Sequence, residues 1–143
     1  MRFMIIVKAN KYSEAGLPPP TDEQFKELMA EMGRFHEELH KAGVLLDASG
    51  LKPSSHGWRM KYQGEKRSFT DGPFAETKEL VAGYTIIQVK SREEALEWSR
   101  RYPNPAGKGG VSEIEVRQFY ELDDFDAPEE EVERFRRLEK ERR

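Results

Sequence analysis

Apolar and polar positions divide the chain into short strands and one-sided helices. Residues 2–8 are a short apolar run rich in β-branched side chains, which predicts a strand with both faces buried. The stretch 10–20 ends in prolines and is expected to be a loop. Apolar side chains then recur at helical spacing over 21–42, so we predict a long amphipathic helix with Thr21 as its N-cap and Gly43 as its stop.

The middle of the chain is typical of strands joined by turns. Residues 44–51 are expected to form a strand, and residues 58–63 alternate apolar with charged or polar side chains, which predicts a half-buried strand. A turn at 64–65 leads into a second strand over 67–70, so the two form a hairpin. Residues 81–90 are again rich in apolar side chains and predict a central strand.

The last third of the chain holds a capped helix, a strand and a charged tail. Ser91 and Glu94 match the capping box and begin a helix that ends before Pro103. A last strand is predicted over 112–119. Residues 129–143 carry few apolar side chains among many charges, which indicates a helical tail that docks lightly or frays.

This order of elements matches a ferredoxin-like βαββαβ arrangement of the α+β class with an inserted hairpin. Two helices cover only one face of such a sheet, yet the strands over 2–8 and 81–90 carry apolar side chains on both faces. The uncovered face needs a partner, and a second copy of the same sheet supplies one. We therefore predict a homodimer in which the two sheets pack face to face.

The charge balance argues against a nucleic-acid partner. Lys and Arg number 24 against 27 Asp and Glu, and the pI is about 5.7, whereas phosphate neutralisation needs a basic surface. The longest apolar run spans only residues 3–7, too short for a membrane span of ~20 residues or for a secretory signal. Cysteine is absent, which excludes disulfides and thiolate chemistry. We expect a cytoplasmic protein with no membrane partner and no cofactor.

Residues 36–40 read HEELH and match the HExxH pattern of zinc proteases. A zinc site needs a third protein ligand, and neither Asp47 nor His56 stands at a suitable spacing. His36 shares the apolar face of its helix, as a packing residue would. His40 lies near the helix C-terminus, where a cation is favourable. We therefore expect no metal site, and zinc hydrolysis through this segment is a remote third hypothesis for function.

The segment at 70–79 reads TDGPFAETKE and resembles the signature of the DGPF branch of the YciI-related family. Further segments similar to this branch lie at residues 13–16, 37–39, 42–46, 50–55, 89–95, 101–105 and 114–118. The likeness covers residues 1–126, expected to form one domain, and leaves the charged helical tail over 127–143 largely outside it. In one departure, close members read Asn-Glu-Glu-Leu where this chain has His-Glu-Glu-Leu at 36–39.

The resemblance implies a ferredoxin-like fold and a dimer of the α/β-barrel kind, in agreement with the burial argument. It implies no settled activity. Proteins of this family have been associated with a His–Asp pair in a cleft, and some relatives of the dimeric fold catalyse lyase or isomerase steps on small cyclic compounds. DGPF proteins also tend to be encoded beside alternative sigma factors, which indicates an accessory role.

Asp71, within this motif, is the acid that we expect to carry any chemistry. It serves either as a general acid or base facing a cleft, or as a cap of its own turn before Gly72 and Pro73. Glu76 is either a second carboxylate that works with Asp71 or a solvated residue in a first helical turn. Lys78 either binds an anionic substrate or is ordinary surface.

His36 is the natural partner for Asp71, because histidine titrates near neutral pH and this one is expected on a buried face. A core histidine bonded to backbone explains the same pattern, and related chains with Asn here favour a packing or ligand-orienting role. Ser54 and Ser55 either offer hydroxyls to a ligand or form a turn. Arg59 is expected to face solvent, opposite its apolar neighbours and within reach of an anion.

These residues support two main hypotheses for function. The leading one is a cleft lined by Asp71, Glu76, His36 and residues 54–59 that binds a small organic molecule, with proton-transfer chemistry of lyase or isomerase type. The alternative is a non-catalytic ligand-binding or regulatory accessory protein that uses the same cleft or the dimer surface. A titratable partner within reach of Asp71 distinguishes them, because catalysis needs a paired acid and base, whereas binding needs only an enclosed pocket.

Overall fold

A computed structural model describes residues 1–19 and 21–142 of the chain. Its main sheet contains the strands β1 (Arg2–Lys8), β2 (Leu45–Gly50), β5 (Val81–Gln88) and β6 (Ile114–Gln118). They lie in the order β2-β5-β1-β6, and every neighbouring pair is antiparallel. The predicted α+β class is therefore confirmed.

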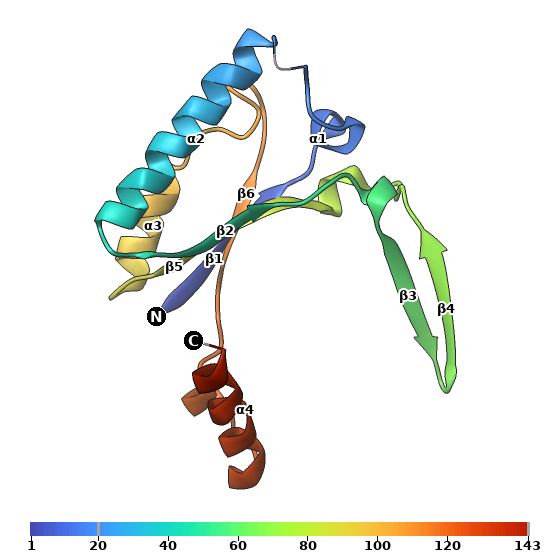
Figure 1. Cartoon of the computed structure of the whole chain (residues 1–143), viewed down its shortest axis with the longest axis vertical. Helices are drawn as coiled ribbons and strands as arrows, with labels where there is room; N and C mark the ends of the chain where they lie inside the picture. The colour runs from blue at the N-terminus through green and yellow to red at the C-terminus, as the bar shows by residue number, and fades with distance from the viewer. Residues whose placement is uncertain (20, 143) are drawn as a thin grey trace.

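Two helices, α2 (Glu23–Lys41) and α3 (Arg92–Arg101), cover one face of this sheet (Figure 1). The buried core between helices and sheet comprises Phe3, Ile5, Phe35, Leu39, Val44, Ile87, Val89 and Ala95. Ile5, Leu39 and Ile87 have no exposed surface, so burial of each side chain stabilises the fold by roughly 1.5–3 kcal/mol. Phe35 and Leu39 lie one turn apart on α2, which is how the helical period seen in the sequence becomes core packing.

The N-cap of helix α2 lies one residue later than predicted, and Gly43 stops the helix as predicted. Asp22, not Thr21, is the N-cap, and its carboxylate accepts a hydrogen bond of 2.9 Å from the Phe25 amide. Gly43 follows the helix with φ +75°, and its amide donates to the His40 carbonyl. The Val44 amide donates to the Leu39 carbonyl at 3.1 Å, which completes a Schellman ending. The left-handed conformation at this ending explains why glycine stands there.

The start of α3 agrees with the prediction, with one difference in its cap. Ser91 accepts a hydrogen bond of 3.1 Å from the Glu94 amide, but the Glu94 carboxylate accepts from the Lys90 amide, not from Ser91. The second hydrogen bond of the capping box therefore comes from the residue before the N-cap. The helix ends at Arg101, ahead of Pro103, as expected.

The predicted loop over 10–20 contains a short helix, α1 (Lys11–Ala15). Asn10 caps it by accepting from the Ser13 amide at 2.8 Å, while the Ser13 hydroxyl accepts from the Asn10 amide at the same distance. A helix of this length is too short to show a hydrophobic period, so the prediction of a loop was wrong at these residues. Pro20, part of the same predicted loop, lies outside the described residues.

The predicted hairpin is present as β3 (Trp58–Gln63) paired with β4 (Lys66–Asp71), and Gly64 in the turn has φ +62°. It projects away from the main sheet as an arm (Figure 1), and all its residues are exposed. The prediction of a half-buried strand was therefore wrong for the single chain. The alternation that suggested it is real, but nothing within the described chain covers the apolar side of the hairpin.

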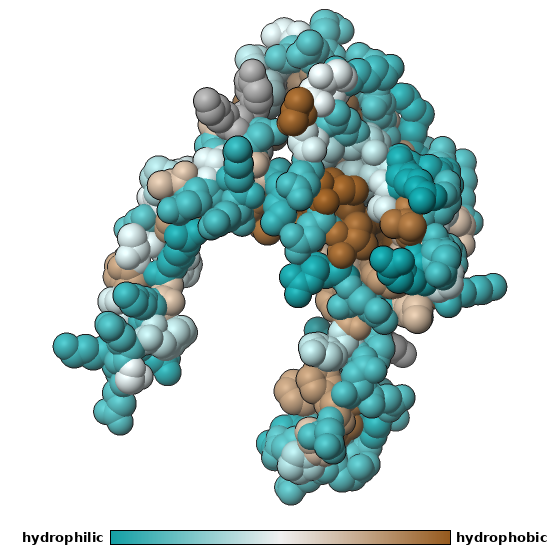
Figure 2. Space-filling model, turned by 180° about the vertical axis from the view of Figure 1, so that it is seen from behind, coloured by the Kyte–Doolittle hydropathy of each residue, from teal (hydrophilic) through white to brown (hydrophobic). Residues whose placement is uncertain are grey.

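The second face of the main sheet is also left uncovered by the part of the chain that the structure describes. Because Phe3 and Ile5 point toward the helices, Met4 and Ile6 point the opposite way. They pair across the sheet with Ile86 and Tyr84, and all four side chains are partly exposed. We call this surface the open face. In Figure 2 apolar side chains gather in a patch on the body of the molecule, above its two arms.

After β6 the chain continues into α4 (Glu129–Glu141), a helix that packs mainly on the preceding turn Leu122–Asp124. It extends beyond the sheet as a second arm (Figure 1). The predicted helical tail is thus present. No helix in the described ranges is both long and apolar enough to span a bilayer.

Candidate functional site

The DGPF turn, residues 71–74, lies at the base of the β3–β4 hairpin and is held against an earlier turn. The Gly72 amide donates to the Gly57 carbonyl at 3.0 Å. A Cβ built on Gly72 would lie 1.8 Å from the Ser54 carbonyl oxygen. Only glycine leaves room for this approach of two backbone segments, which gives the glycine of the motif a structural reason.

A chain of hydrogen bonds joins this turn to α1. The Ser54 amide donates to the Glu14 carboxylate at 2.9 Å, and the Ser54 hydroxyl donates to the other oxygen of the same carboxylate. The Phe74 amide in turn donates to the Ser54 hydroxyl oxygen at 3.0 Å. Ser54, predicted to touch a ligand or form a turn, therefore links three segments that are far apart in the sequence.

Glu14 was missed as a site residue by sequence reasoning. The only signal that pointed to it was its place within residues 13–16, one of the segments that resemble the DGPF branch. Its carboxylate receives two charge-assisted hydrogen bonds from one residue, an arrangement stronger than two neutral bonds. Glu14 therefore positions the turn at Ser54.

Arg59 lies at the start of the hairpin and packs on the same motif. Its guanidinium carbon sits 3.9 Å from the centre of the Phe74 ring, within the range of a cation–π contact. Its side chain is exposed, as expected from the alternation of β3. The ring fixes the flat guanidinium beside the DGPF turn, where its N–H groups are available to an anion.

The charged residues of the motif lie close together in the sequence, but no ion pair joins them in the described structure. Asp71 ends β4 opposite Trp58, and its side chain is exposed. Glu76 and Lys78 are exposed at the short turn Thr77–Glu79. Within the described ranges no side-chain hydrogen bond or ion pair joins Asp71 to Glu76 or to His36, and the Asp71 carboxylate does not cap its own turn. Ser55 is exposed beside Ser54.

His36 lies away from the DGPF turn, between α2 and the sheet, and both of its ring nitrogens are hydrogen-bonded there. Its Nδ1 lies 2.7 Å from the Met32 carbonyl and its Nε2 lies 2.8 Å from the Thr85 hydroxyl. A carbonyl cannot donate, so Nδ1 carries the hydrogen toward Met32, while Nε2 and the Thr85 hydroxyl share the second hydrogen bond. This is the arrangement of a core histidine bonded to backbone.

The hydrogen-bond chain from His36 continues to Tyr102. The Tyr102 hydroxyl lies 3.4 Å from the Thr85 hydroxyl, whose side chain is 1% exposed. Either hydroxyl can be the donor in this contact. Burial raises the pKa of Tyr102, which keeps this group protonated and able to donate.

Two grooves of about 400 Å³ lie near the end of α3, away from the DGPF turn. One is lined by Ser99, Tyr102, Pro103, Asn104, Pro105, Gly110, Val111, Ser112 and Ile114. The other is lined by Glu31, Arg34, Phe35, Glu38, Arg101 and Pro103. In the first, Asn104 is already bonded to Ala106, Gly110 and Ser112 of its own loop. Neither groove includes a predicted site residue.

The HEELH segment gathers no metal ligands around it. His36 uses both ring nitrogens in the core, and His40 is exposed in the last turn of α2. Across residues 1–19 and 21–142, no three His, Asp or Glu side chains come together in a way that could hold a metal ion.

Comparison with known proteins agrees with the resemblance seen in the sequence. The family model of the YCII-related domain matches residues 1–120. The chain is also similar to an uncharacterised protein of Rhizobium meliloti (strain 1021), with 28% identity over 98 residues, which is 68% of this chain and 79% of that protein. Helix α4 lies beyond the part matched by the family model.

Proposed function

This chain belongs to the YCII-related family, and from that premise we propose that it works as a homodimer that binds a small organic acid beside the DGPF turn. The observation that carries the proposal is the Arg59 guanidinium, which lies over the Phe74 ring beside a turn that Glu14 and Ser54 hold in place. Such a fixed cation recognises a carboxylate by two parallel hydrogen bonds. Lys78 adds a second positive charge on the same motif.

The dimer part of this proposal is supported by the composition of the open face. Its apolar centre is formed by Met4, Ile6 and Ile86. At one rim Lys8 pairs with Glu115 at 3.2 Å, which lowers the pKa of that carboxyl group. An apolar centre with a polar rim is typical of protein interfaces.

In this dimer each copy is a ferredoxin-like βαββαβ unit with the β3–β4 hairpin as an insertion, and two open faces close an α/β barrel. The sheet order β2-β5-β1-β6 with antiparallel neighbours supports this assignment. The DGPF turn opens to solvent in one chain, so the second copy would supply the wall that encloses a ligand.

Binding is favoured over acid–base catalysis because the expected catalytic pair is not assembled within one chain. Both ring nitrogens of His36 are already hydrogen-bonded, to Met32 and Thr85. Asp71 and Glu76 remain candidates for proton transfer of lyase or isomerase type only if a group from the second copy completes the pair.

The ligand proposal is tested by NMR titration of the labelled protein with a panel of small carboxylic acids. We expect amide shifts at residues 54–59 and 71–78, lost in Arg59→Ala and retained in the matched control Arg92→Ala on α3. Absence of any binding acid, or equal binding by both variants, would overturn the assignment. Catalysis would be indicated instead if Asp71→Asn left binding intact but abolished conversion of a bound acid.

The dimer proposal is tested by light scattering during gel filtration. We expect twice the chain mass of 16.6 kDa for the native protein. Ile86→Asp places a charge in the apolar centre of the open face and should yield monomers, whereas Leu96→Asp on the outer side of α3 should remain dimeric. A native protein that elutes as a monomer would contradict the proposal.

A further inference from the structure

The β3–β4 hairpin carries an aromatic face on which the Arg67 guanidinium lies over the Tyr62 ring and which no other element of the described chain covers. Trp58, Met60 and Tyr62 alternate along β3 and share one side, and Phe69 joins them because it pairs with Met60. Trp58, Tyr62 and Phe69 are each more than 60% exposed. A surface of this kind is rare on a monomer without a partner.

The C-terminal arm, residues 119–142, is a second such surface. The rings of Tyr120 and Phe125 pack 5.0 Å apart, and Phe135 and Leu138 lie one turn from each other on α4. All four side chains are at least 48% exposed. An amphipathic helix with its apolar side open to water gains stability only by covering that side.

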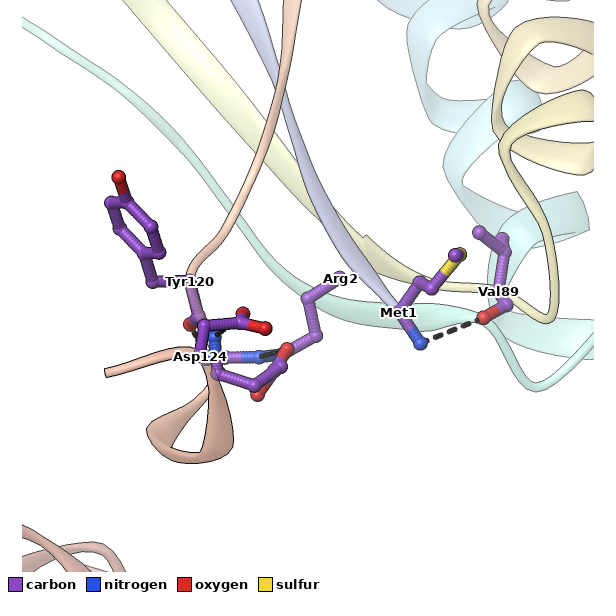
Figure 3. A network of polar contacts seen from close by, with 6 residues as sticks. Met1, Arg2, Val89, Tyr120 and Asp124 are labelled. Atoms are coloured by element: carbon purple, nitrogen blue, oxygen red, sulfur yellow. Dashed lines mark hydrogen bonds and ion pairs between the residues drawn. The ribbon is translucent and has the colours of Figure 1, made fainter. Parts of the chain in front are cut away.

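The C-terminal arm is tied to the sheet at its root. The Arg2 guanidinium donates to both oxygens of Glu121, at 2.9 and 3.2 Å, and also to the Tyr120 carbonyl. The Glu121 amide donates to the Asp124 carboxylate at 2.7 Å (Figure 3). The bond with Glu121 also raises the pKa of Arg2. The arm is therefore held at this end of the sheet by contacts that leave Tyr120, Phe125, Phe135 and Leu138 exposed.

The two arms carry opposite charge. Residues 58–71 contain four basic and two acidic side chains, whereas residues 119–142 contain ten acidic and five basic ones. Opposite potentials steer two surfaces together and set which pairs form. The hairpin and the C-terminal arm are thus complementary both in apolar surface and in charge, although neither covers the other within one chain.

The arms also stand in the right places for an exchange between two copies. Figure 1 shows the hairpin and α4 extending from the sheet as the two sides of an arch, and Figure 2 shows an apolar patch on the body from which both arms extend. In a two-fold dimer, a contact between the hairpin of one copy and the C-terminal arm of the other forms twice, because an isologous interface pairs surface i with surface j and j with i.

We infer that, in the dimer on which the proposed function rests, the hairpin of each copy packs its aromatic face on the C-terminal arm of the other. Because α4 lies beyond the YCII-related match, this contact is an addition to the family domain. It would also fix the hairpin, and with it the DGPF turn at the hairpin base, relative to the partner subunit.

The contact is tested first by cross-linking, since the chain contains no cysteine. A full-length chain with Met60→Cys and Leu138→Cys, treated with a short bifunctional maleimide, should run as a covalent dimer. A matched chain with Met60→Cys and Leu96→Cys should not. Cross-links confined to one chain, or equal yields in both, would overturn the inference.

A second test follows the environment of Trp58 without a cross-linker. Trp98→Phe leaves Trp58 as the one tryptophan of the full chain, so acrylamide quenching reports its exposure. Adding Phe135→Asp should raise the quenching constant and weaken dimerisation by about tenfold, or about 1.4 kcal/mol. Arg137→Asp on α4 is the charge control and should change neither value by as much.

The outcomes separate this inference from the dimer itself. If the protein remains a dimer and Trp58 is readily quenched both with and without Phe135→Asp, the hairpin contact is wrong and the open-face dimer stands. If the native chain is a monomer, the proposed dimer fails first. Protection of Trp58 that Phe135→Asp leaves unchanged would place the hairpin on another surface and overturn the inference.

Discussion

The two faces of the main sheet carry similar apolar side chains but differ in burial. On one face Phe3, Ile5 and Ile87 are covered by α2 and α3 and are almost wholly buried. On the other, Met4 and Ile86 alternate with them and remain partly exposed. The alternation in a strand therefore shows that a face is apolar, but not which element covers it. The following predictions separate positions that are closed within one chain from those that are open.

The largest expected effect is in the closed core. Leu39→Ala removes a side chain with no exposed surface and should lower the free energy of unfolding by about 2–5 kcal/mol. Met29→Ala on the same helix, where the side chain is 54% exposed, should change it by less than about 0.5 kcal/mol. Urea unfolding followed by circular dichroism measures both. An equal cost at the two positions would mean that the outer side of α2 is also covered.

The next effect tests whether the DGPF turn is closed by backbone packing. Gly72→Ala places a methyl group against the Ser54 carbonyl and should lower the free energy of unfolding by about 3 kcal/mol.

Gly33→Ala is the matched control, because no atom lies within 4 Å of the new Cβ in the middle of α2. There alanine should stabilise the helix by up to about 1 kcal/mol. The same unfolding assay measures both variants, and a tolerated Gly72→Ala would show that the two turns do not press together in solution.

The polar chain in the core should respond to loss of one hydroxyl. Thr85→Val keeps the shape but leaves His36 Nε2 and the Tyr102 hydroxyl without their partner, at a cost of about 1–3 kcal/mol. Thr70→Val on the exposed hairpin should cost far less. If the two variants are equally stable, the hydrogen bonds of Thr85 contribute nothing net.

The smallest effect is a pH dependence at Tyr102. Burial raises the pKa of its hydroxyl above the ordinary value of 10.0, so the folded state holds this proton at a pH where the unfolded chain has lost it. Stability should therefore be unaffected below pH 10 by this group and fall as pH rises from there through the folded-state pKa. Tyr102→Phe should flatten that fall, measured by unfolding at increasing pH. An unchanged slope would contradict a raised pKa.

Among the candidate site residues, sequence reasoning was informative about the motif and not about its partners. It selected Ser54 and Arg59, which the structure brings to the DGPF turn. It paired Asp71 with His36, but His36 is occupied by Met32 and Thr85. It missed Glu14, because α1 is too short for a periodic signal and its partner lies 40 positions away.

The sequence by itself determined the strands and the longer helices, though not the short helix α1, and where α2 and α3 stop. Caps such as Gly43 and Ser91 and the period of apolar side chains are local properties, set by backbone dihedrals and by neighbours within a few residues.

Only the tertiary structure decided that the β3–β4 hairpin extends away from the main sheet with its residues exposed, and that Gly72 lies against Ser54. It alone decided as well that His36 bonds to Thr85. These contacts join residues distant along the chain, and which of them form depends on how the whole set of elements packs, information that no local pattern of residues contains.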